Sequence, residues 1–336
     1  MKIIKSLFTV AVIASAGILA GTANAQTVMK VGLGVPESHF DVRGMRLFEK
    51  YVEEKTNGDI QVDLYPATQL GNDKEVLDSI KVGVAQMNLP GPAVLGGFVK
   101  DMTILSLPYL FETQEIADKV VDGPWGQKLL DKLKKAGFIG LGYGDFGYRN
   151  VTNNVREIAK LEDFNGIKLR VMQNPSHIAV FRALGANPTA MAMSEVFSAC
   201  QQGVIDGQEN PLKNISSNKF HEVQKYLTLS NHAYEWILFV VGKKWFEALP
   251  VEQQQIIQEG CDIAKDYMRK AVKADDAEAL EEIKASGVKV TELDPAEVKR
   301  IRDKAWSVVE KEGNKINKEL FSELMIAIDD AKKSLN

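Results

Sequence analysis

The order of strand-like and helix-like segments is the feature that most constrains how this chain folds. Short runs with alternating or clustered apolar residues are separated by longer runs with apolar residues at helical spacing. This alternation predicts an α/β fold with long C-terminal helices. The strand-like runs cover residues 28–34, 60–65, 87–89, 138–143, 167–172, 227–241 and 288–291. The helix-like runs cover residues 40–55, 74–82, 114–121, 125–135, 176–184, 194–202, 250–285 and 295–336.

One of these helical regions is unusually long. Residues 250–285 exceed the length of an ordinary globular helix several-fold. We expect either a break in this region or a helix that spans two domains.

The first 25 residues have the pattern of a secretory signal peptide. Lys2 and Lys5 precede an apolar core at residues 7–19, and Ala23-Asn24-Ala25 forms an A-x-A cleavage site. The core is shorter than a membrane span requires, although a retained N-terminal anchor is the alternative reading. We therefore expect residues 1–25 to be removed and the mature protein to be exported.

Length and charge limit the partners of the mature chain. Residues 26–336 suffice for two domains of about 150 residues each. The formal net charge of −4 for the full sequence, which becomes −6 without Lys2 and Lys5, is dispersed. This argues against nucleic acid, because that partner requires a basic stripe. Cys200 and Cys261 are expected to be buried free thiols. No Cys or His pair has the spacing of metal ligands, so we expect no metal and no cofactor.

Catalytic motifs are missing from the sequence. It contains no G-x-S-x-G, H-E-x-x-H or P-loop motif, and its four histidines are scattered. The glycines at 142, 144 and 147 spell G-x-G-x-x-G, but residues 148–152 are β-prone where a dinucleotide site requires a helix. Since catalytic residues can come from distant segments, a secreted enzyme is disfavoured rather than excluded.

Arg170 is the most informative polar residue of the chain. It lies in the middle of the strand-like run at residues 167–172, before a turn at Asn174-Pro175. A guanidinium is always charged, so its burial requires an anion or a set of acceptors. Its fork of donors fits a carboxylate with two parallel hydrogen bonds. An exposed strand-end arginine or an internal ion pair is the alternative.

Four segments carry a resemblance to a known family. They are YPATQLGNDKEVLDSIKVG, SLPYLF, IKLRVMQNP and ANPTAMAMSEVFSACQQGVIDGQENPL, in this order along the mature chain. The sequence resembles the substrate-binding proteins of tripartite ATP-independent periplasmic (TRAP) transporters. The resemblance implies a two-lobed periplasmic binding protein with a hinge and interleaved lobes. Lobe I would comprise residues 26–147 and 235–275, and lobe II residues 148–234 and 276–336.

The resemblance also implies a function and partners. Such a protein captures an organic acid by hinge closure and delivers it to a membrane permease that uses an ion gradient. It performs no reaction, and we expect a monomer. A periplasmic sensory module with the same pocket is an alternative.

The resemblance assigns the ligand clamp to three residues. Arg170 would hold the carboxylate, Arg149 in GYRN would assist it, and Asn210 in QENP would donate a further hydrogen bond. Arg149, Glu209 and His232 match a network near the hinge. Glu209 would then fix Arg149 and couple ligand binding to lobe movement, whereas an ordinary structural ion pair is the alternative reading.

Specificity is expected to come from the remaining walls of the cleft. Asp73 in QLGND matches a ligand-contacting position of part of the family, and Met193 matches a residue that packs on the ligand. Glu37 and His39 follow the first strand, where α/β crevices receive ligands. The remaining candidate contacts are Asn88, Asn174 and Trp236.

The ligand class is narrowed by two departures from the sialate-binding branch. That branch carries a glutamate and an arginine in the loop at residues 90–94, which here reads PGPAV, and an asparagine where this chain has Gly34. A hexuronate or related sugar acid is therefore favoured. A C4-dicarboxylate, a 2-oxo acid and sialate stay open.

Overall fold

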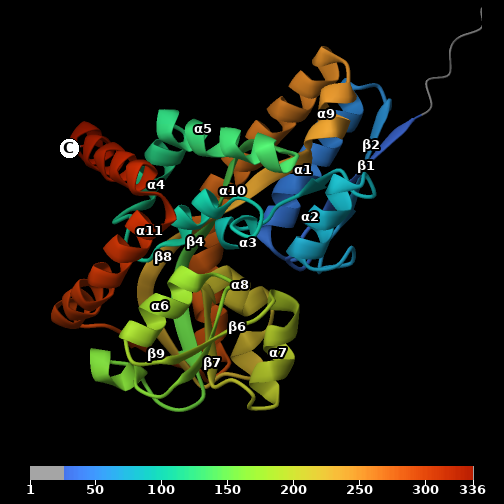
Figure 1. Ribbon diagram of the computed structural model, residues 1–336. Helices are drawn as coiled ribbons and strands as arrows, with labels where there is room; N and C mark the ends of the chain where they lie inside the picture. The colour runs from blue at the N-terminus through green and yellow to red at the C-terminus, as the bar shows by residue number, and fades with distance from the viewer. Residues whose placement is uncertain (1–25, 336) are drawn as a thin grey trace, which may run out of the picture.

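The computed structural model describes residues 26–335 and shows a mixed α/β protein with two bodies joined by long strands (Figure 1). Nine strands form one sheet in the order β2-β1-β3-β8-β4-β7-β5-β6, and β9 pairs with β8 outside this path. The sheet therefore runs continuously from one body into the other. The predicted signal peptide lies outside the described residues.

The first body begins with parallel β-α units. It contains β1 (Thr27–Gly32), α1 (Phe40–Lys55), β2 (Ile60–Tyr65), α2 (Asp73–Lys81) and β3 (Met87–Asn88). β1 pairs in parallel with both β2 and β3. α2 begins at a capping box, in which the Asn72 side chain accepts from the Glu75 N–H and Glu75 accepts from Asn72. The alternation of strand and helix predicted from the sequence is confirmed here.

Short helices then cover the sheet before the chain crosses. They are α3 (Pro92–Leu95), η1 (Lys100–Ser106), α4 (Gln114–Val121), α5 (Pro124–Asp131) and η2 (Lys132–Ala136). Threonine 113 caps α4 and proline occupies the start of α3 and α5, which suits the first turn of a helix.

Two long antiparallel strands join the bodies. β4 (Phe138–Asn153) and β8 (Tyr226–Gly242) pair along their whole lengths, from Phe138 opposite Gly242 to Asn153 opposite Tyr226. Three register shifts bend this pair. The G-x-G-x-x-G glycines lie inside β4 rather than at a strand–helix turn, so a dinucleotide fingerprint is excluded.

The second body holds the segment around Arg170. Its elements are η3 (Leu161–Phe164), β5 (Lys168–Val171), α6 (Pro175–Ala183), β6 (Asn187–Ala190), α7 (Met193–Gln201), β7 (Gly207–Pro211), α8 (Leu212–Ser217), η4 (Phe220–Glu222) and β9 (Lys289–Glu292). β6, β7 and α8 were not predicted as a strand or helix from the sequence. All three are short and carry polar or proline residues that hide any periodicity.

Three helices finish the chain: α9 (Lys243–Ala248), α10 (Val251–Ala285) and α11 (Pro295–Leu335). α10 is unbroken over 35 residues and packs on α1 in the first body and on α8 in the second, so it spans both (Figure 1). α11 is interrupted at Asn317, whose side chain accepts from the Leu320 N–H at 3.2 Å and so caps the second half.

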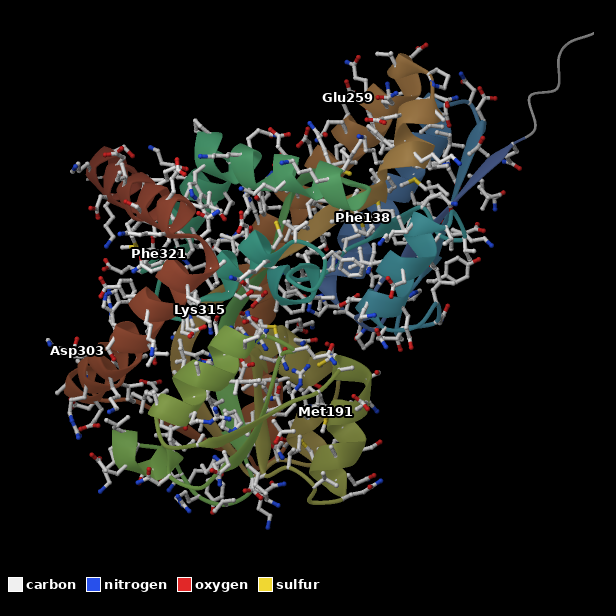
Figure 2. The ribbon with its side chains drawn as sticks, viewed as in Figure 1. Phe138, Met191, Glu259, Asp303, Lys315 and Phe321 are labelled. Carbon is white, nitrogen blue, oxygen red and sulfur yellow. The ribbon has the colours of Figure 1, made fainter. Side chains whose placement is uncertain are left out.

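Three apolar clusters stabilise this arrangement. The largest joins α4, α5 and α11 to β5 and α6, as the side chains around Phe321 in Figure 2 illustrate. Cys200 and Cys261 are free and buried, as predicted. No helix within residues 26–335 is both long and apolar enough to cross a membrane.

Candidate ligand-binding site

A cavity lies where the two bodies meet. It encloses about 960 Å³, including solvent at its mouth. One wall comes from the segment after β1, the start of α2 and the loop after β3, and the other from β5, β7 and the segment before α7. The crossing strands β4 and β8 form its floor. Both bodies therefore contribute to a single site.

Arg170 on β5 is buried in this cavity, with 4% of its surface exposed. Its Nε and Nη2 donate to the carbonyl oxygen of Met191, at 3.0 and 2.7 Å. No ion pair within residues 26–335 includes Arg170, and its Nη1 makes no hydrogen bond to those residues. Burial lowers the pKa of the guanidinium to about 10, so it remains charged at neutral pH. Arg170 is thus a buried cation whose positive charge has no carboxylate partner among the residues that the structure describes.

Arg149 on β4 is in the opposite situation. Its Nε and Nη2 donate to the carboxylate of Glu209, the latter at 3.0 Å, and Nη2 also donates to Asn210 Oδ1 at 3.2 Å. Its Nη1 lies 3.7 Å from Glu235 Oε2. Arg149 lines the cavity but is already compensated by protein carboxylates.

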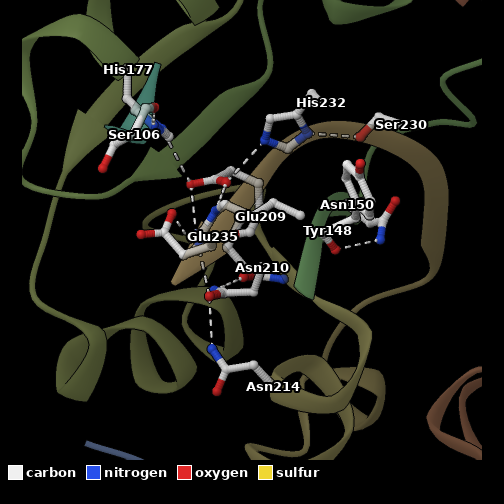
Figure 3. Close-up of polar contacts among 12 residues, drawn as sticks. Ser106, Tyr148, Asn150, His177, Glu209, Asn210, Asn214, Ser230, His232 and Glu235 are labelled. Atoms are coloured by element: carbon white, nitrogen blue, oxygen red, sulfur yellow. Dashed lines mark hydrogen bonds and ion pairs between the residues drawn. The ribbon is translucent and has the colours of Figure 1, made fainter. Parts of the chain in front are cut away.

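Glu209 contacts both Arg149 and His232, and Figure 3 shows the contact with His232. His232 Nε2 is 3.1 Å from Glu209 Oε2, and its Nδ1 is 2.9 Å from Ser230 Oγ. Burial alone would raise the pKa of Glu209, but Arg149 and the His232 hydrogen bond hold it well below its usual range. The three residues that the sequence grouped are thus adjacent in the fold.

Asn210 is held by a chain of amides at the end of β7. Its Oδ1 accepts from Asn214 Nδ2 at 2.7 Å (Figure 3), and its Nδ2 donates to Gln208 Oε1. Met193 Sδ lies 3.9 Å from the same Nδ2, and all of Asn210, Asn214 and Met193 line the cavity. The Asn210 amide is therefore oriented at the cleft wall beside Arg149.

Asp73 lines the cavity from the first body, at the start of α2. Burial raises the pKa of its carboxyl group to about 6, although a contact with Asn88 opposes the shift. Gly34 faces it, since a Cβ built there would lie 3.2 Å from Asp73 Oδ1. Asn88 does not line the cavity, but its Nδ2 donates to the Asp73 carbonyl at 3.1 Å and supports that wall.

The other sequence candidates are placed differently. Trp236 on β8 is buried and lines the cavity. Glu37 points to solvent, with 60% of its side chain exposed, and pairs with Arg46. His39 is buried behind the cavity, where it caps α1. Asn174 caps α6 and borders a separate cavity. None of Glu37, His39 and Asn174 is among the residues that line the site.

Two acidic residues of the lining were not singled out from the sequence, namely Glu235 and Asp41. Glu235 lies on β8, 2% exposed, and burial raises the pKa of its carboxyl group to about 7. Burial likewise raises the pKa of Asp41. A lone carboxylate inside the apolar run YEWILFVV was the available signal for Glu235.

These features define a class of protein: a two-lobed solute-binding protein with a cleft that carries an unpaired buried arginine. The chain belongs to family 7 of the bacterial extracellular solute-binding proteins, the DctP family, whose family model matches residues 31–315. It is therefore a TRAP-type solute-binding protein for organic acids, a family that works with membrane permease subunits and does not catalyse reactions.

Three relatives illustrate the family. The C4-dicarboxylate-binding periplasmic protein DctP of Rhodobacter capsulatus is 37% identical over 73% of this chain and 74% of its own length. The 2,3-diketo-L-gulonate-binding periplasmic protein YiaO of Escherichia coli is 33% identical over 83% of this chain and 86% of its own. The crystal structure of the sugar acid binding protein DctPAm of Advenella mimigardefordensis, in complex with galactonate, superposes with a TM-score of 0.88 at 37% identity. The match covers 90% of this chain and 98% of the DctPAm chain.

Proposed function

We propose that this protein captures a sugar acid, a hexuronate or a related aldonate, and delivers it to a TRAP permease. The observation that carries the proposal is Arg170, a buried guanidinium without a carboxylate partner in a cavity between two lobes. Its positive charge favours an anionic ligand, and its planar fork suits a carboxylate. Arg149 and Asn210 stand beside it as the assisting contacts.

The rest of the cavity favours a ligand with hydroxyl groups. Asp73, Asp41 and Glu235 offer carboxyl groups to the cleft, and hydroxyls can donate hydrogen bonds to them. The related protein that holds galactonate supports the same ligand class. By the resemblance, Gly34 and the loop PGPAV at residues 90–94 match positions where the sialate-binding branch carries larger polar side chains.

A C4-dicarboxylate is the second candidate, because the Rhodobacter capsulatus relative is named for that ligand. A second carboxylate would need a second free cation. Apart from the two arginines, the described lining of the cavity offers Lys74, which is exposed and lies 3.0 Å from Asp78. Because Lys74 is already paired with Asp78, it is not free to bind a second carboxylate of the ligand. This favours the sugar acid over the dicarboxylate.

Closure of the lobes is the proposed mechanism of capture. The ligand touches both walls only when they approach, so it stabilises the closed form. Reversing a 99:1 preference for the open form requires about 10⁴-fold tighter binding to the closed form. Glu209 links the clamp residue Arg149 to His232 on the crossing strand β8, which suits a coupling role. We further propose a periplasmic monomer that begins at Gln26, which mass spectrometry of the exported protein would test.

Thermal unfolding with a panel of acids tests the proposal. Galactonate, glucuronate, succinate and pyruvate are added to the wild type, to R170A and to R182A, whose arginine is exposed on α6. A ligand at 100 times its Kd adds about 2.7 kcal/mol of stability. We expect a sugar acid to raise the Tm of the wild type and of R182A but not of R170A. Equal shifts in R170A would contradict the proposal.

A further inference from the structure

Glu235 occupies an unusual place in the sheet. It lies on β8 opposite Gly147 of β4, within a strand whose residues from 232 to 242 are all buried. Its side chain faces the ligand cavity rather than the apolar core. Strands of this kind exclude carboxylates unless a partner is available.

The Glu235 carboxylate has few polar partners among the described residues. Neither Oε1 nor Oε2 has a hydrogen-bond partner among residues 26–335. The nearest cation is Arg149, at 3.7 Å, and Glu209 already holds the other edge of that guanidinium. A buried polar group left in this way costs about 1–3 kcal/mol, and more when charged. Glu235 is therefore an acceptor aimed at something other than the described protein atoms.

The position of Glu235 relative to the clamp limits what this partner can be. Arg149 contacts Asn210 with Nη2 and faces Glu235 with Nη1. On the opposite side, a Cβ at Gly91 would lie 3.1 Å from Glu235 Oε1, so the loop leaves room for the carboxylate and little more. Glu235 thus stands beside Arg149, the residue expected to assist in holding the acid group of the ligand, so the part of the ligand next to that group would lie near Glu235.

We infer that Glu235 is a specificity-determining residue, which accepts a hydrogen bond from a hydroxyl group close to the carboxylate of the ligand. The inference rests on the proposed capture of an organic acid at Arg170. A hydroxyl satisfies the carboxylate of Glu235, whereas a methylene leaves it unsatisfied. A second carboxylate at this position is repelled. Glu235 therefore selects hydroxy acids over acids of equal length without hydroxyls and over dicarboxylates.

Binding of matched acids to the E235Q variant tests this role. Isothermal titration compares D-galactonate, D-glucuronate and D-erythronate with two six-carbon acids without hydroxyls, hexanoate and the dicarboxylate adipate. Glutamine has the same shape but lacks the charge. We expect the hydroxy acids to bind E235Q about tenfold more weakly, because charge-assisted hydrogen bonds are the stronger ones. Adipate should bind it more tightly than it binds the wild type, because the repulsion is gone.

Opposite changes for the two kinds of acid distinguish recognition from a structural role, which would weaken both. E235D keeps the charge and should keep the order of preference at lower affinity. E54Q, an exposed glutamate of α1, serves as the control and should match the wild type. A ratio of galactonate to adipate affinity that is the same in E235Q as in the wild type would overturn the inference alone. Acid binding that survives in R170A, or no acid binding by the wild type, would overturn the proposed function as well.

Discussion

Arg170 donates two hydrogen bonds to the carbonyl oxygen of Met191, at 3.0 and 2.7 Å, across the gap between β5 and the segment that leads into α7. This contact fixes one edge of the guanidinium. It satisfies two of its N–H donors, but a carbonyl oxygen does not neutralise its positive charge. The charge stays available to the cavity, and the segment that carries Met193 is held against the same residue. Anion binding and the position of this wall are thereby joined in one side chain.

Replacement of Arg170 by methionine should separate binding from stability. Methionine keeps much of the apolar stem but removes a buried cation that has no protein anion. We expect loss of acid binding by at least 100-fold, together with a free energy of unfolding that is unchanged or higher in the ligand-free protein. Urea denaturation and isothermal titration measure the two quantities. A strongly destabilised R170M would show that the guanidinium is mainly a structural group.

The E209Q variant should be destabilised because it leaves Arg149 short of its main partner. Removal of one member of a buried ion pair costs about 3–5 kcal/mol, and Glu235 at 3.7 Å compensates only part of this. Urea denaturation measures the loss. Small-angle scattering with and without galactonate then reports lobe closure. If E209Q binds the acid and closes as the wild type does, Glu209 has no coupling role.

The contribution of Glu209 to stability should depend on pH. Its folded pKa is lowered, so its stabilising effect is present above its unfolded value of 4.5 and is lost as the pH falls through the folded value. The difference in free energy of unfolding between wild type and E209Q should therefore shrink below pH 4.5. Denaturation at pH 7 and at pH 3.5 measures it. An unchanged difference would contradict the ion pair.

Glu235 should have the opposite pH dependence. Burial raises its pKa to about 7 from an ordinary value of 4.5, so the folded protein binds the extra proton between these values. Wild type therefore loses stability relative to E235Q as the pH rises from 4.5 to 7, by about 2–3 kcal/mol. Urea denaturation of both proteins across this range measures the change. Arg149 and Glu209 also act on the pKa of Glu235, so both residues are kept unchanged in the two proteins that are compared.

Asp73 should contribute less to affinity than Arg170 does. It is half-buried on the wall of the first body and can accept from a ligand hydroxyl. D73N should weaken galactonate binding by about tenfold, since a hydrogen bond to a charged group contributes about 1.5–3 kcal/mol net and the asparagine side chain can keep part of it. Titration with D78N, an exposed acid on the same helix, gives the matched control. A D73N affinity equal to that of D78N would remove Asp73 from the site.

Several elements could be predicted to the residue because their signals are local. The limits of α1, β2 and α4 agree with those expected from apolar spacing and turn residues. The strands β6 and β7 and the helix α8 escaped prediction because pairing with neighbours, rather than periodicity, holds such short polar segments. Residues 250–285 were recognised as long for one globular helix, with a break or a helix across two domains as the expected outcomes, and the structure shows that α10 spans both bodies.

Some residues of the candidate site could be predicted from the sequence and others could not. Arg170 could be singled out because a cation within an apolar strand demands an explanation from charge alone. Glu235 has the same signature, yet it was passed over because a strand pattern does not tell which buried face opens onto a cavity. Glu37 and His39 follow the right strand, but the turn after β1 sends one to solvent and the other behind the cavity.

The amino-acid order was enough to predict the alternation of most strands and helices and an arginine that must meet an anion, because apolar spacing and the charge of a single side chain need no knowledge of distant neighbours. The family was indicated by the resemblance of four sequence segments. Folding was needed to show that Arg149 is neutralised by Glu209, that Arg170 has no ion-pair partner within residues 26–335, and that Glu235 lies 3.7 Å from Arg149 without a hydrogen-bond partner in that range. Pairing of buried charges depends on distances between strands far apart in the chain, and those distances exist only after folding.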